Sequence, residues 1–186
     1  TDQVTAIKTL AVAALTTAQI EALSSDQAQA LNSSQVAVLS SAQLAALSSE
    51  ELNTFTTAEI SALTVAALAG LSTDNLAALS TGSIAALKTT QIAALKTGQI
   101  AALTTDQAAV LTSSQLGALS TLQVKAISTD SIAALKTDQV ASLKTLAISA
   151  LTTAQITALT SDQAQALSST LVAALSSAQI GALASE

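Results

Sequence analysis

The sequence predicts an all-α solenoid, a spiral of very short helices with one helix in each eight-residue repeat. Three observations predict it: an eight-residue phrase repeats without interruption, the phrase is rich in Ala, and its Ser, Thr and Gln residues suit helix N-termini. The phrase is clearest at 87–103, LKTTQIAALKTGQIAAL, where it occurs twice. We number its positions so that Leu87 is position 1.

The apolar residues keep a strict register. Position 1 recurs at every eighth residue from Ile7 to Leu183 and is Leu at 20 of 23 sites. Position 6 is always apolar, and position 8 is nearly always Ala. A fixed period of this kind is typical of repeats that bury their apolar faces against their neighbours. We therefore expect positions 1, 6 and 8 inside, and the variable position 7 in water.

Other secondary structures fit the repeat less well. In one continuous helix, eight residues advance about 800°, so the Leu row would spiral around the helix and form no single buried stripe. In a β-solenoid, the strands would alternate polar and apolar residues and contain little Ala, whereas the segment QIAAL does neither. A short helix that restarts in every octad is the remaining solution.

The residue that caps each helix has two possible registers. If position 2 is the N-cap, Ser/Thr-x-x-Gln forms a capping box, with positions 1 and 6 as its hydrophobic staple. If position 3 is the N-cap, its Ser or Thr at 23 of 24 sites is explained. Lysine, a poor cap, occupies position 2 at Lys8, Lys88, Lys96, Lys136 and Lys144. We therefore prefer position 3, with each helix running from position 4 to the next position 1.

A single octad cannot fold alone. Its helix has under two turns, and burying one Leu and one Ile contributes roughly 1.5–3 kcal/mol each. Ordering eight backbone units costs about 1–2 kcal/mol per residue. Stability must therefore come from stacking, in which the Gln found at 14 of 23 position-5 sites is expected to form a cap or an inter-repeat hydrogen bond.

A longer period lies over the octad. Residues 1–50 match residues 137–186 at 36 of 50 positions, an offset of 136 residues or 17 octads. Because 17 is odd, alternating helices of hairpins would exchange roles between the two copies. A smooth spiral of nearly equivalent octads, forming one continuous domain over residues 1–186, fits better.

The composition limits the chemistry of the chain. It has no Cys and no His, a net charge of −6 and only scattered carboxylates, so we expect no enzyme activity, no cofactor and no metal site. The net negative charge also argues against nucleic-acid binding. The longest run without a polar residue, Val65–Leu71, has 7 residues, far short of the about 20 that a membrane-spanning helix needs. We expect no membrane insertion.

The octapeptide itself resembles a known repeat type. Leu15–Ala22 and Leu151–Ala158 have the form L-T-T-A-Q-I-x-A, which resembles repeat tracts in large secreted or surface proteins of Gram-negative bacteria, some described as adhesins. This resemblance implies an extracellular or cell-surface location. Some of those proteins carry calcium-binding nonapeptides of the type G-G-x-G-x-D, but this sequence lacks the pattern.

Two functions follow from these expectations. The first is a structural spacer or stalk that projects other domains of a larger chain. The alternative is a binding module that takes a host protein or a glycan on the solenoid surface. For the alternative, the segment that departs most from the consensus is the candidate interaction patch, comprising Glu50, Glu51, Phe55, Glu59 and Val65.

Overall fold

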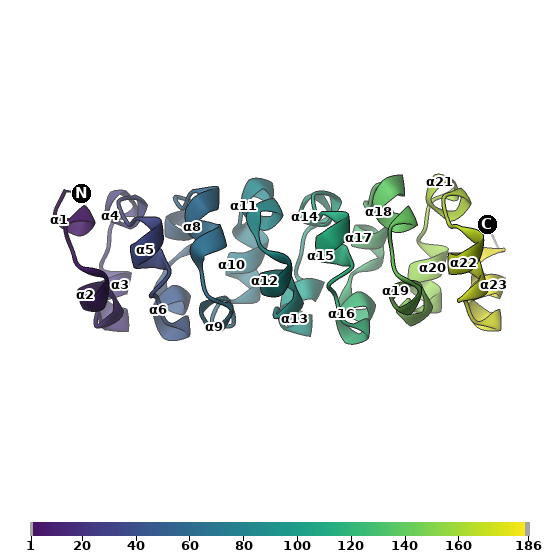
Figure 1. The fold of residues 1–186 in the computed structure, drawn as a ribbon, viewed down its shortest axis with the longest axis horizontal. Helices are drawn as coiled ribbons and strands as arrows, with labels where there is room; N and C mark the ends of the chain where they lie inside the picture. The colour runs from purple at the N-terminus through teal and green to yellow at the C-terminus, as the bar shows by residue number, and fades with distance from the viewer. Residues whose placement is uncertain (1, 185–186) are drawn as a thin grey trace. The chain divides into compact units, whose positions relative to one another are not determined.

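A computed structural model describes residues 2–184, and the secondary structure of this range consists of 23 α-helices (Figure 1). Position-3 residues Thr1 and Ser185, together with Glu186, lie outside the described range. The helices are α1 (Asp2–Thr5), α2 (Thr9–Ala13), α3 (Thr17–Glu21), α4 (Ser25–Gln29), α5 (Ser33–Val36), α6 (Ser41–Ala46), α7 (Ser49–Leu52), α8 (Thr57–Ala62), α9 (Val65–Leu68), α10 (Thr73–Ala78), α11 (Thr81–Ala86), α12 (Thr89–Ala93), α13 (Thr97–Ala101), α14 (Thr105–Ala109), α15 (Ser113–Leu116), α16 (Thr121–Ala126), α17 (Thr129–Ala133), α18 (Thr137–Ala141), α19 (Thr145–Ala150), α20 (Thr153–Thr157), α21 (Ser161–Gln165), α22 (Ser169–Ala173) and α23 (Ser177–Leu183). The predicted all-α class, with one helix per octad, is confirmed.

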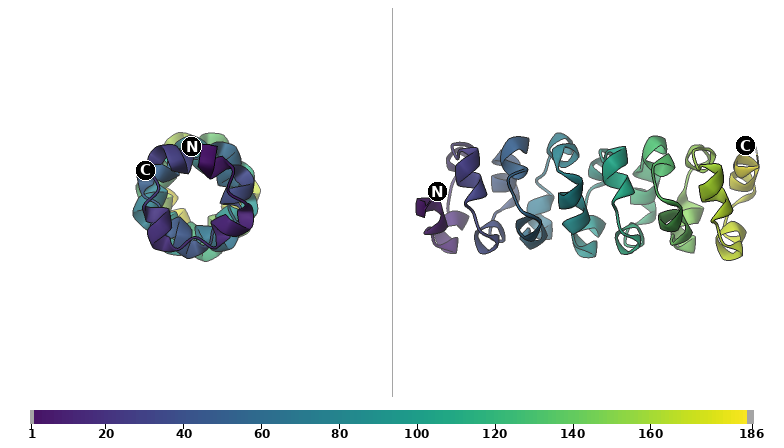
Figure 2. Two further views of the ribbon diagram at one scale, coloured as in Figure 1. Left: turned by 90° about the vertical axis from the view of Figure 1, so that its left-hand side faces the viewer. Right: turned by 90° about the horizontal axis from the view of Figure 1, so that it is seen from above.

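The helices form two compact units, Thr1–Leu95 and Lys96–Glu186. Within each unit, a helix packs against the helix three octads further on, as α3 does on α6 in the first unit and α13 on α16 in the second. Figure 2 shows the purple and blue helices of the first unit following one another around a ring. Each unit is therefore a spiral rather than a stack of hairpins. The single continuous solenoid over residues 1–186 stays a prediction.

The N-cap is position 2, so our preference for position 3 is wrong. At α3, the Thr16 Oγ1 accepts the backbone N–H of Gln19 (3.3 Å), and the Gln19 Oε1 accepts the backbone N–H of Thr16 (2.9 Å). This reciprocal capping box satisfies two N-terminal donors, whereas a cap at position 3 would leave the Gln one residue too near to return a bond. The helices consequently begin at position 3, one residue earlier than expected.

Lysine at position 2 keeps only half of this box. The backbone N–H of Lys88 still donates to the Gln91 Oε1 (2.6 Å), but an ammonium group has no lone pair with which to accept the N–H of Gln91. The Lys octads therefore rely on the Gln and on packing to begin their helices.

Two extended residues join consecutive helices. Between α6 and α7, Leu47 has φ −76° and ψ 137°, and Ser48 has φ −72° and ψ 165°. Across the described residues, no φ is positive. The chain therefore turns without the left-handed conformation that favours Gly, which agrees with a sequence of 5 Gly and no Pro.

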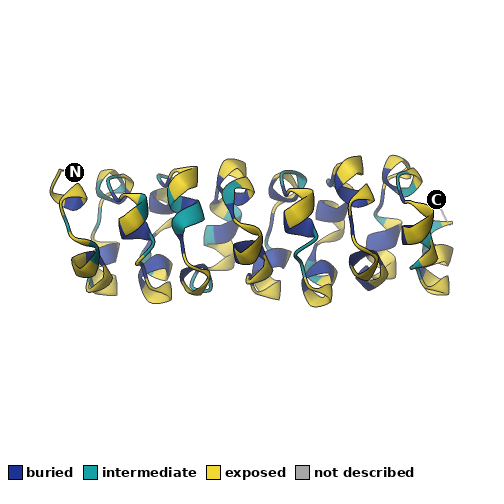
Figure 3. Cartoon of the chain, in the orientation of Figure 1, coloured by how far each residue is buried: buried dark blue, intermediate teal, exposed yellow. Residues whose placement is uncertain are grey.

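The buried face of each helix comprises positions 1, 5 and 6, and Figure 3 shows the buried and exposed sides of the helices. Leu87 and Ile92 are buried as predicted at positions 1 and 6, and Gln91 at position 5 is only 2% exposed. The expectation that position 8 lies inside is wrong: Ala94 is exposed, and Ala150 is the one buried position-8 residue in the described range. At 100° per residue, position 8 points about 100° away from the centre of the face formed by positions 5, 6 and the next position 1.

Candidate functional site

The glutamines at position 5 connect one turn of the spiral to the next. In the first unit, the Gln43 Nε2 donates to the carbonyl oxygens of Val12 (2.9 Å) and Leu15 (2.8 Å). In the second, the Gln155 Nε2 donates to those of Val124 (2.9 Å) and Ile127 (2.7 Å). The acceptors lie 31 and 28 residues before each Gln. One turn therefore contains about 28 residues, or three and a half octads.

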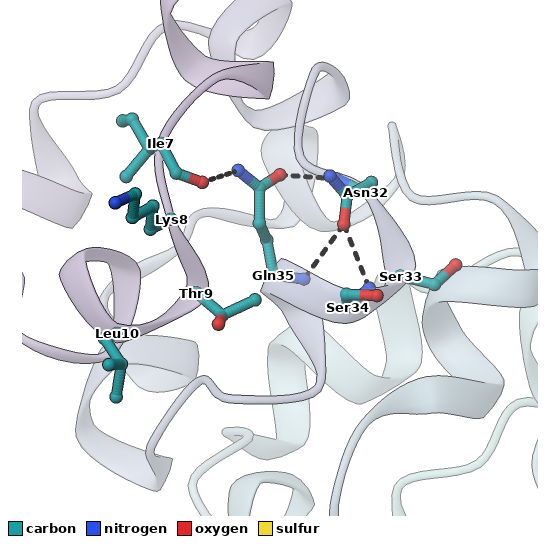
Figure 4. A pocket seen from close by; sticks show the side chains of 8 residues that line it. All are labelled: Ile7, Lys8, Thr9, Leu10, Asn32, Ser33, Ser34 and Gln35. Atoms are coloured by element: carbon teal, nitrogen blue, oxygen red, sulfur yellow. Dashed lines mark hydrogen bonds between the residues drawn. The ribbon is translucent and has the colours of Figure 1, made fainter.

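One amide group thus serves two helix ends at once. Figure 4 shows the Gln35 Oε1 accepting the backbone N–H of Asn32 (2.8 Å) while its Nε2 donates to the Ile7 carbonyl (2.9 Å). The Asn32 Oδ1 accepts the backbone N–H groups of Ser34 (3.0 Å) and Gln35 (3.1 Å). The last carbonyls of a helix lack intrahelical partners, so the Gln supplies donors that the helix below cannot. The two roles weighed for this residue, cap and inter-repeat hydrogen bond, occur together.

Shorter side chains at position 5 reach less far. The Asn75 Nδ2 donates to the Leu47 carbonyl (3.0 Å), and the Ser131 Oγ donates to the Leu103 carbonyl (3.3 Å), both 28 residues earlier. No bond from either to the second acceptor, 31 residues earlier, is present. The length of Gln therefore explains its frequency at this position.

Glu51 occupies a Gln position but cannot make the inter-turn bonds. It is 8% exposed, and its Oε2 accepts the backbone N–H of Ser48 (2.8 Å) and the Ser48 Oγ–H (3.0 Å). The same offsets direct its side chain toward the carbonyls of Ile20 and Leu23. An ionised carboxylate only accepts hydrogen bonds, so it cannot donate to these carbonyls.

We expect Glu51→Gln to raise the free energy of unfolding by about 1 kcal/mol, because it keeps the cap and adds donors to the turn below. Urea denaturation followed by circular dichroism measures the change. Glu50→Gln is the matched control: Glu50 is exposed, lies in the same first turn and loses a similar interaction with the helix dipole. Equal effects of the two substitutions would contradict the prediction.

The candidate patch is divided between the core and the surface. Phe55 is 4% exposed and fills a position-1 site, and Glu51 and Glu59 cap their own helices. Glu50 and Val65 are the exposed members, and they lie on α7 and α9. In each unit, a helix stacks on the helix three further on, so α7 and α9 are not stacked on each other. The patch and the binding alternative stay predictions.

Acidic residues form columns that the sequence did not reveal. Asp26, Glu50 and Asp74 occupy position 4 of α4, α7 and α10, which stack on one another, and all three are exposed. The Ser25 Oγ donates to the Glu50 Oε1 (3.3 Å) across this column. In the second unit, the same 24-residue spacing places Asp106 and Asp130 on α14 and α17, and Asp138 and Asp162 on α18 and α21. The spacing is visible in the sequence, but its meaning depends on which helices stack.

The Ser and Thr residues at position 3 are half-buried or exposed along the described chain. The Ser25 bond to Glu50 is their one side-chain hydrogen bond in this range. They therefore form a row of hydroxyl groups at helix starts, available to solvent.

The described chain shows no clustered chemistry. Among residues 2–184, no three Asp or Glu side chains are grouped so as to hold a metal ion. No helix in that range has the length and apolar character needed to cross a bilayer.

The short helices, their stacking on every third neighbour and their shared capping box define a helical tandem-repeat solenoid. The chain matches the ALTTAQ repeat family at residues 1–33, 54–89, 81–113 and 108–145, which is more than half of its length, and it belongs to this family. Comparisons with curated proteins and with solved structures find no match. The family describes a repeat, which agrees with a structural repeat protein.

Proposed function

We propose that this chain is a non-enzymatic spacer segment of a larger bacterial surface or secreted protein. The observation that supports the proposal is the constant link between turns: the same amide donates to the carbonyls 28 and 31 residues earlier in both units. A link of this kind lets each added octad repeat the contacts of the octads before it. Length can then grow without a new fold, which is the property a spacer needs.

Two further features support the proposal. The sequence has no His or Cys, and the described residues form no metal-binding cluster, so the side chains that most often serve catalysis are scarce. The surface location is supported by the resemblance of the L-T-T-A-Q-I-x-A octads to tracts in large surface proteins.

Insertion of additional turns tests the spacer. A second copy of residues 97–152 placed after residue 152 adds seven octads and twice the 28-residue offset, so it preserves both the octad register and the stacking. Small-angle X-ray scattering is expected to show equal increases in maximum dimension for one and for two inserted copies. Circular dichroism should show an unchanged helical content per residue.

The control insertion has the same length but consists of Gly and Ser. It should increase the dimension with the weaker dependence of a flexible chain and lower the helical content per residue. An unchanged maximum dimension on insertion of residues 97–152 would contradict the spacer.

A further inference from the structure

The interface between turns is closed wherever a turn lies below it. Interior glutamines at position 5, such as Gln43, Gln91 and Gln155, are 2–3% exposed, and each donates to carbonyls of the preceding turn. Interior residues at position 6, such as Ile92 and Ile156, are 0% exposed. Each closed interface therefore joins amide donors and apolar side chains from two turns.

The N-terminal face carries the donor half of this interface without acceptors. Gln19 is exposed and Gln27 is half-buried. Their Oε1 atoms accept the N-cap N–H groups of Thr16 and Ser24 (2.9 Å each), as in the interior. Their Nε2 groups have no protein acceptor, because no turn lies before them in the described chain. The amides are thus oriented by their caps and free to donate.

The C-terminal face carries the acceptor half. Ile180 is 38% exposed although position 6 is buried throughout the interior, and Val172 is half-buried. By the offsets of 28 and 31, the carbonyls of Val172 and Leu175 await one amide, and those of Ile180 and Leu183 await the next. No position-5 amide of the described chain reaches these four carbonyls.

We propose that the C-terminal face of one chain docks on the N-terminal face of a second copy, head to tail. If the second copy continues the octad count after α23, Gln19 of that copy meets the carbonyls of Val172 and Leu175. Gln27 of that copy then meets the carbonyls of Ile180 and Leu183. The contact repeats the interface already present within each unit, so its donors, acceptors and apolar residues match.

This contact joins two different faces, so it does not close on itself. A heterologous contact without rotational closure extends into an open assembly. The partner is a second copy because a turn of this octad supplies both the amide spacing and the apolar residues that the two faces need.

Blocking each face separately tests the docking. Gln19→Glu with Gln27→Glu blocks the N-terminal face: Glu retains the cap, as Glu51 and Glu59 do, but cannot donate to a carbonyl. Ile180→Glu blocks the C-terminal face. Leu122→Glu is the control, because Leu122 is 68% exposed and lies on neither face. Circular dichroism verifies that each variant folds.

Sedimentation velocity is expected to show the wild type and Leu122→Glu growing in mass with concentration. Each face variant alone should stay monomeric. An equimolar mixture of the two face variants should form 1:1 dimers and no larger species, because one open face of each kind remains. A wild type that stays monomeric at every concentration, face variants that assemble like the wild type, or loss of assembly in Leu122→Glu would overturn the proposal.

Discussion

Gln155→Ala is expected to lower the free energy of unfolding by about 3 kcal/mol, because it leaves buried polar groups without partners. The Gln155 side chain donates to the carbonyls of Val124 (2.9 Å) and Ile127 (2.7 Å), and it accepts the backbone N–H of Thr152 (2.8 Å). It is 2% exposed, so water cannot replace these bonds without opening the turn. Urea denaturation measures the loss.

Gln19→Ala is the matched control. Gln19 occupies the same octad position and caps its own helix through Thr16, but it is exposed and makes no inter-turn bond. Its substitution should cost only about 0.5–1 kcal/mol, the usual worth of a cap. If Gln155→Ala and Gln19→Ala cost the same, the inter-turn bonds contribute nothing to stability and capping alone explains the frequency of Gln.

Gly70→Ala has the second large expected effect. A Cβ atom at Gly70 would lie 2.0 Å from the Ser41 carbonyl oxygen and 2.7 Å from the Ser41 carbonyl carbon. Both atoms belong to the backbone of the preceding turn, so the two turns must separate for Ala to fit. Such overpacking costs about 1–3 kcal/mol. Position 8 is Ala in most octads, so this close approach is specific to the contact between Gly70 and Ser41.

Gly98→Ala supplies the opposite sign. A Cβ atom at Gly98 meets no atom within 4 Å, and Gly98 lies inside α13. Replacing an unhindered helical Gly by Ala stabilises by up to about 1 kcal/mol, since it restricts the unfolded chain. Thermal denaturation of both variants tests the pair. A stabilising Gly70→Ala would show that the turns separate at little cost.

Much of the repeat unit could be predicted from local patterns. The eight-residue period, the Ala content and the Ser/Thr-x-x-Gln spacing predict one short helix per octad, with positions 1 and 6 buried and position 7 in water. The structure confirms these features at octads such as Leu87–Ala94. They depend on residues within one octad, so a single sequence determines them.

The cap register and position 8 were predicted wrongly because composition was taken as a measure of geometry. The near-uniform Ser and Thr at position 3 suggested a cap, yet Thr89 is the first helical residue and Lys88 the N-cap. Small size suggested a buried Ala at position 8, yet Ala94 lies beside the buried face. The deciding residue in both cases is Gln91, whose reach back to Lys88 starts the helix and whose reach across to Ile60 and Leu63 places it inside.

The sequence by itself determined that every octad is a capped helix with an apolar face too small to stand alone. Only the tertiary structure decided how many octads make one turn. That number depends on the angle between helices and on where the amide of one turn meets the carbonyls of the turn below, 28 and 31 residues away. Because neither offset is a multiple of eight and 136 is not a multiple of 28, no period in the sequence reports the turn.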